Sequence, residues 1–70
     1  MAPMGAVGEL TSEFCRRSGW DGVDTTPVER RIRLALGEFP ERAVREAVAA
    51  VREPIKPWAW LDRLRRFGVG

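Results

Sequence analysis

The chain has 70 residues, of which 12 are basic and 10 are acidic, and its net charge at pH 7 is +2. This length allows a single small domain, and the one cysteine excludes a disulfide within the chain. There is no histidine, which removes the commonest catalytic base and leaves no ligand set for a structural zinc ion. We therefore expect a protein without enzymatic activity, metal or cofactor.

The composition also bears on the location of the protein. No apolar run approaches the roughly 18 residues that a membrane span needs. The start of the chain lacks the basic and apolar regions of a secretory signal. An unpaired cysteine suits a reducing compartment. We expect a cytoplasmic protein that has no membrane partner.

The charges are unevenly distributed along the chain. Residues 25–70 hold ten basic and six acidic side chains, whereas residues 1–24 hold two basic and four acidic ones. A basic C-terminal half favours an anionic partner such as nucleic acid. An arginine-rich, solvated surface without any partner would give the same count, so the charge alone does not decide between them.

The N-terminal part predicts a short tail followed by a helix. Residues 1–5 show no pattern and are expected to be a loose tail, so that residues 6–70 form a single helical domain. Apolar side chains then recur at helical spacing over about residues 6–18, namely Val7, Leu10, Phe14 and Cys15. Gly19 is suited to end this helix. We interpret Cys15 as a buried structural thiol, because it lies close to the Leu10 and Phe14 face.

A loop and a second helix follow. Residues 19–27 are rich in Gly, Asp and Thr and predict a loop, from which Trp20 and Val23 fold back onto the core. Thr26 as N-cap, Pro27 at the first helical position and Glu29 two residues later predict a capping box. The next apolar side chains form one stripe: Val28, Ile32, Ala35 and Leu36. Gly37 is expected to end this helix.

Two more helices complete the predicted fold. Pro40 opens the third, whose apolar stripe consists of Val44, Ala47, Val48 and Val51, and Pro54 cannot continue it. Pro57 opens the fourth, in which one face carries Trp60, Leu61, Leu64 and Phe67. No stretch alternates as a strand would. We predict an all-α protein, a small bundle of about four short helices with no sheet.

Trp58 lies off the apolar stripe of the fourth helix. Its helical neighbours include Asp62 and Arg65. An exposed aromatic ring beside arginines is a common platform for stacking a nucleic-acid base. In the other interpretation, Trp58 folds over Val51 and Ile55 as a lid, because a small core benefits from every large side chain.

The basic residues of the C-terminal half fall into two groups. The first group lies on the second helix and consists of Arg30, Arg31 and Arg33. The second lies around the fourth helix and consists of Lys56, Arg63, Arg65 and Arg66. Arginine pairs with phosphate and stacks on bases, so neighbouring helices would merge the two groups into one basic surface. Intrahelical pairs such as Glu29–Arg33 are the alternative, but the second group has only Asp62 as an acidic neighbour on its helix.

Residues 25–68 resemble the DnaD-like domain of bacterial and phage replication-initiation proteins, which include primosome components and helicase loaders. The stretch "TTPVERRIRLALGEFPERAVREAVAAV" is similar to that family's helix start, short apolar helix, turn and alanine-rich helix. In "KPWAWLDRLRRF", Trp60 takes the place of the family's aromatic residue and Leu64 that of the following aliphatic one. The family's second aromatic place falls on Gly68, with Phe67 one residue earlier. The resemblance implies DNA binding, with a replication initiator or the replicative helicase as protein partners.

The leading hypothesis is a small DNA-binding or replication accessory module that contacts single- or double-stranded DNA mainly through phosphates. The residues expected to do so are the two basic groups and Trp58. The alternative is a protein-interaction module, of phage origin in one version, that docks on a larger replication or transcription protein through Trp58, Trp20 and nearby basic residues. A third possibility is a helical domain of a longer protein.

Overall fold

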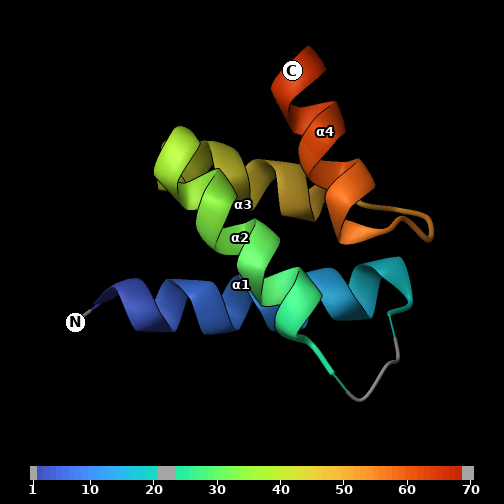
Figure 1. The fold of residues 1–70 in the computed structure, drawn as a ribbon, viewed down its shortest axis with the longest axis horizontal. Helices are drawn as coiled ribbons and strands as arrows, with labels where there is room; N and C mark the ends of the chain where they lie inside the picture. Colours follow the sequence, from blue (N-terminus) through green and yellow to red (C-terminus); the bar gives the residue numbers. More distant parts are fainter. Residues whose placement is uncertain (1, 21–23, 69–70) are drawn as a thin grey trace.

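The computed structural model of the chain describes residues 2–20 and 24–68 (Figure 1). Over these residues the chain forms four helices and no strand: α1 (Ala2–Ser18), α2 (Thr26–Glu38), α3 (Glu41–Ala49) and α4 (Pro57–Phe67). The prediction of an all-α bundle without a sheet is confirmed. The helix α2 contacts each of the other three helices, and α1 also contacts α3. No helix in the described part of the chain is long and apolar enough to span a membrane.

The first helix begins at Ala2 and therefore includes residues 2–5, for which the sequence pattern predicted a tail. Pro3 is compatible with this start, because the amide groups of a first helical turn have no partner within the helix. The helix ends as predicted at Gly19, whose φ of 73° is in the left-handed region. The amide of Trp20 then donates to the carbonyl oxygen of Cys15 at 3.0 Å, which completes a Schellman-type end.

The start of α2 differs from the predicted capping box. The N-cap residue is Thr25, and its side chain makes no capping hydrogen bond. The carboxylate of Asp24 accepts a hydrogen bond from the Thr26 amide at 2.9 Å. Hydrogen bonding by Thr26, through its side chain and its backbone amide, lowers the pKa of Asp24. The Thr26–Glu29 box is therefore wrong, because the Thr26 amide donates to Asp24 instead of Glu29, and the Glu29 amide donates to the Thr25 carbonyl oxygen at 2.9 Å.

The other helix ends also differ slightly from the sequence pattern. The helix α2 passes Gly37 and ends at Glu38, and Pro40 is the N-cap of α3 rather than its first residue. The helix α3 ends at Ala49, before Pro54 is reached. Residues 50–56 form a non-helical connection to α4, in which Val51 is still buried.

The core is built from the apolar stripes of all four helices. Its buried members are Leu10, Phe14, Val28, Ile32, Ala35, Val44, Val48, Val51, Trp60, Leu61 and Leu64. Phe14 of α1 and Trp60 of α4 meet edge to face, with ring centroids 5.4 Å apart. The Trp60 indole N–H donates to the carbonyl oxygen of Ala47 at 3.4 Å, so its one polar group is satisfied although the ring is buried. The prediction that Trp60 anchors α4 is confirmed.

Phe67 does not belong to this core, although it continues the periodicity of α4. Its side chain is 75% exposed. Figure 1 shows the last turn of α4 extending beyond the other helices, which agrees with this exposure. The prediction of a shared apolar face therefore holds for Trp60, Leu61 and Leu64 and is wrong for Phe67.

The loop after α1 agrees with the sequence pattern where it is described. Trp20 is half-buried and packs against the core, as predicted, whereas Val23 lies outside the described residues. Cys15 is half-buried and also packs against the core, and burial raises the pKa of its thiol. A raised pKa reduces the thiolate fraction, which suits a structural thiol.

Candidate nucleic-acid interface

Trp58 lies in the first turn of α4 with 49% of its surface exposed. Its indole ring meets that of Trp20 edge to face, with centroids 6.4 Å apart and ring planes at 90°. The sequence pattern placed Trp58 off the buried stripe, and this is confirmed. It did not connect Trp58 with Trp20, because the partner comes from a loop and no helical spacing relates the two residues.

The Trp20–Trp58 pair is fixed by two further contacts. The Trp20 indole N–H donates to the backbone carbonyl oxygen of Asp24 at 3.3 Å. The ammonium group of Lys56 lies 5.4 Å from the centroid of a Trp20 ring, within the range of a cation–π interaction. A lysine charge, a held aromatic pair and a half-exposed indole face thus occur together at the N-terminal end of α4.

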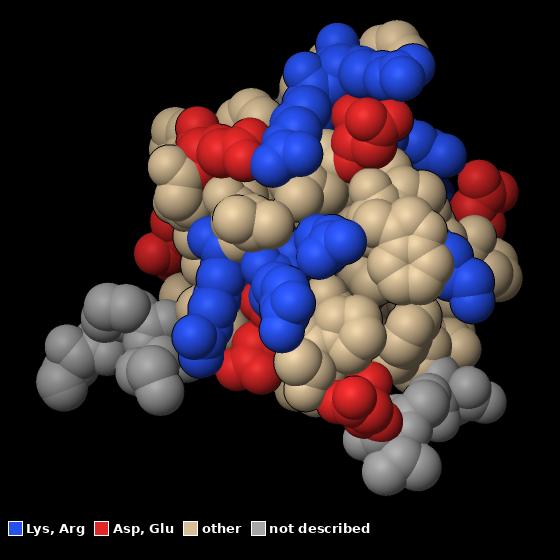
Figure 2. Space-filling view, in the orientation of Figure 1, with Lys and Arg blue, Asp and Glu red and all other residues tan. Residues whose placement is uncertain are grey.

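The basic group predicted on α2 is partly paired. Figure 2 shows basic side chains over α2 next to an apolar surface where the first turn of α4 lies. Arg33 is paired with Glu29 at 3.1 Å, as the intrahelical alternative predicted. Arg30 and Arg31 form no ion pair with any described residue. These two cationic side chains therefore lie unpaired on α2, the helix that packs against α4.

The C-terminal arginines are less available than the sequence suggested. Arg65 forms a two-pronged ion pair with Glu38 of α2, in which the Arg65 Nε and a Glu38 carboxylate oxygen are 2.9 Å apart. Arg66 is paired with Asp62 at 3.1 Å. Hydrogen bonding between Arg65 and Glu38 lowers the pKa of Glu38 and raises that of Arg65. The sequence pattern predicted only Asp62 as an acidic neighbour of these arginines. It missed Glu38, because Glu38 lies on another helix and is distant in the sequence.

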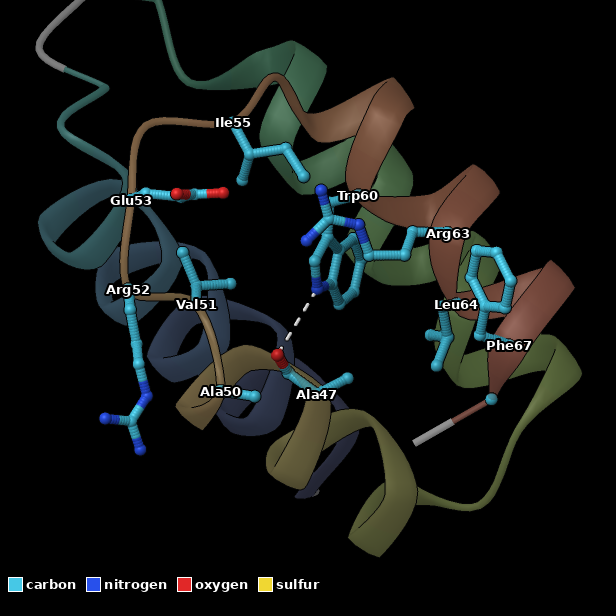
Figure 3. Close-up of a pocket in the computed structure, with 11 residues that line it drawn as sticks. Ala47, Ala50, Val51, Arg52, Glu53, Ile55, Trp60, Arg63, Leu64 and Phe67 are labelled. Carbon is cyan, nitrogen blue, oxygen red and sulfur yellow. Dashed lines mark hydrogen bonds between the residues drawn. The ribbon is translucent and has the colours of Figure 1, made fainter. Parts of the chain in front are cut away.

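Arg63 lies apart from the aromatic pair. It has no ion pair among the described residues, and its side chain lines a groove with Trp60, Leu64 and Phe67 (Figure 3). The structure therefore brings together Trp58, Trp20 and Lys56, whereas Arg63 lines the groove. The merging of the two basic groups into one surface stays a prediction.

The side chains around Trp58 determine which ligand chemistry this surface could accept. A half-exposed indole can stack on a planar ring, and guanidinium and ammonium groups neutralise phosphate. Among residues 2–20 and 24–68, no group of three or more Cys, Asp or Glu side chains is placed to hold a metal ion. No family model, curated protein or solved structure matches this chain. Its function is therefore inferred from the side chains and their geometry.

Proposed function

We propose that the chain is a small nucleic-acid-binding module that binds DNA through phosphate contacts and through stacking on Trp58. The observation that carries the proposal is the half-exposed Trp58 indole, which packs at right angles to the Trp20 ring, itself 5.4 Å from the Lys56 ammonium group. Arg30 and Arg31, which have no ion pair in the described part of the chain, supply the phosphate contacts on the adjacent helix.

The physical terms of this binding are electrostatic attraction and stacking. Each neutralised phosphate releases counterions, which gives affinity without sequence readout. Stacking of one base on an aromatic ring contributes about 1–3 kcal/mol and tolerates any base. The Trp20 contact limits the motion of the Trp58 ring, so less conformational entropy is lost when a base binds.

Arg65 and Arg66 take a secondary part in this proposal, because Glu38 and Asp62 already neutralise them. Exposed ion pairs of this kind contribute little to stability, so a phosphate can compete with the carboxylate. Arg33 is likewise already neutralised, by its ion pair with Glu29. We expect these three residues to modulate affinity and the free cations to determine it.

The resemblance of residues 25–68 to the DnaD-like domain supports a role in DNA replication. On that basis, the proposed protein partners are a replication initiator or the replicative helicase. The module would then hold DNA while its partner is recruited.

The test is a fluorescence-anisotropy titration with labelled single- and double-stranded DNA at several salt concentrations. Arg30→Ala/Arg31→Ala should weaken binding and flatten the log–log salt dependence by about 0.7–0.9 per lost phosphate contact. The matched control is Arg16→Ala/Arg42→Ala, which removes the same charge from exposed positions of α1 and α3. Equal effects of the two double variants would show nonspecific attraction and contradict the proposed site.

A second candidate function is protein docking through the same aromatic pair. Tryptophan is enriched among residues that dominate protein–protein interfaces, and a half-exposed, prearranged indole suits such a contact. The two functions differ in what Trp58→Ala changes. Loss of DNA affinity supports the first, whereas unchanged DNA binding together with loss of helicase or initiator binding supports the second.

A further inference from the structure

A groove lies between the end of α3, the connection of residues 50–56 and α4, with a volume of about 470 Å³. Its apolar lining includes the buried side chains Val51, Trp60 and Leu64 and the half-buried Ile55 (Figure 3). An open, apolar depression of this size on so small a domain is suited to receive a large apolar side chain.

Phe67 forms part of the edge of this groove and is the most exposed large apolar side chain of the described residues, at 75%. It follows Trp58 by about two and a half helical turns, which places the two side chains on opposite sides of α4. The groove and Phe67 are therefore separate from the proposed nucleic-acid surface, and a partner bound there would leave Trp58 accessible.

The groove carries charges of both signs. Glu53 extends from the connection and Arg63 from α4, on opposite walls (Figure 3). Neither is in an ion pair with any described residue, and the same holds for Arg52 beside them. A ligand with a single charge would pair with only one of Glu53 and Arg63. A second surface that carries the same two charges in the reverse order would pair with both.

We propose that the groove receives the Phe67 side chain of a second copy of this chain, in a two-fold symmetric dimer. A protruding ring and an apolar depression that lie side by side on one surface are self-complementary, which is the requirement of a two-fold interface. The same rotation brings Arg63 of each copy toward Glu53 of the other. The occupant is thus fixed by shape and by the paired charges.

The interface is small, and this determines how the dimer should behave. The described residues expose 4698 Å² in all. A standard stable interface takes roughly 800 Å² from each partner, which is more than one groove and one phenylalanine supply. We therefore expect a reversible dimer whose population rises with protein concentration.

The test is sedimentation equilibrium of the full chain from about 10 μM to about 1 mM, the range in which small interfaces associate. Wild type should pass from monomer toward dimer, and Phe67→Ser should weaken the association at least about tenfold. Leu34→Ser is the matched control, because Leu34 is also an exposed apolar residue, at 44%, and does not line the groove. Both positions are exposed, so circular dichroism should show an unchanged fold.

Charge reversal tests the proposed orientation. Arg63→Glu and Glu53→Arg should each weaken the dimer, and the double variant should regain most of the wild-type affinity. A wild type that stays monomeric over the whole range overturns the proposal, as does a Phe67→Ser variant that associates like wild type. Single reversals that are not rescued by the double variant overturn the two-fold arrangement. None of these results depends on DNA binding.

Discussion

Trp20 and Trp58 meet edge to face with their ring planes at 90°, and this contact ties the loop after α1 to the first turn of α4. Trp58 is therefore both a packing residue and an exposed one. The sequence left a stacking platform and a lid over Val51 and Ile55 as alternatives, and in the structure the Trp58 side chain is 49% exposed and packs against Trp20. The contact also makes the loop conformation relevant to any ligand that approaches Trp58.

Replacing Trp58 by alanine should affect stability and binding together. The lost edge-to-face contact should lower the free energy of unfolding by about 0.5–1.5 kcal/mol beyond the effect of the lost buried area. DNA binding should weaken by about 1–3 kcal/mol, measured at a temperature where the variant is fully folded. Trp58→Phe keeps an aromatic ring, so its losses of stability and of DNA affinity should both be smaller than those of Trp58→Ala. Unchanged DNA affinity in Trp58→Ala would remove stacking from the proposed function.

Trp60→Ala should be far more damaging to the fold. It removes a 4% exposed ring, its contact with Phe14 and its hydrogen bond to Ala47. Such a change costs about 3–5 kcal/mol, which is most of the stability that a domain of this size has. Thermal unfolding followed by circular dichroism should show a strongly lowered midpoint or no transition at all. A midpoint near that of wild type would mean that Trp60 is not a core residue.

The Glu38–Arg65 pair predicts a pH dependence of stability. Hydrogen bonding with Arg65 lowers the pKa of Glu38 in the folded chain relative to the unfolded one. Its contribution is therefore fully present above the unfolded pKa and is lost as the pH falls through the lower, folded pKa. Denaturant unfolding at a series of acidic pH values should show that the free energy of unfolding falls less with decreasing pH for Glu38→Gln than for wild type. Glu53→Gln removes a carboxylate that has no ion pair in the described residues. Its free energy of unfolding should fall with decreasing pH as much as that of wild type.

The last turn of α1 offers a stabilising substitution. The hydroxyl of Ser18 is buried and has no hydrogen-bond partner among the described groups. An unsatisfied buried polar group costs about 1–3 kcal/mol, so Ser18→Ala should raise the free energy of unfolding. Ser12→Ala, at an exposed position of the same helix, measures the smaller gain from helix propensity alone. A gain at Ser18 no larger than that at Ser12 would indicate that the Ser18 hydroxyl is hydrogen-bonded in solution.

The helices could be predicted from the sequence because burial along a helix repeats locally. Val28, Ile32 and Ala35 are buried on α2, and Leu61 and Leu64 on α4, at the spacing that the sequence shows. That spacing gives the face of a helix. It does not show how far the neighbouring helices extend, which is why Phe67 was placed in the core although α4 outruns its neighbours.

The site was predicted less completely than the fold, since its contacts join distant residues. Glu38 meets Arg65 across two helices, and Trp20 meets Trp58 from a loop. Neither pair has a spacing that a sequence pattern could reveal. At the start of α2 the error was local, because Asp24 takes the Thr26 amide that Glu29 would accept from in a capping box, and the helix begins one residue earlier than predicted.

The contact between Phe14 and Trp60 has a consequence for the order in which the protein is made. A growing chain leaves the ribosome from its N-terminus, so α1 emerges well before α4. Until α4 follows, the ring of Phe14 lacks the indole that packs against it, and the nascent helices present an apolar surface to solvent. Closure of the core must therefore wait until α4 has been synthesised. During that interval, a chaperone that recognises exposed aromatic side chains could bind the nascent chain.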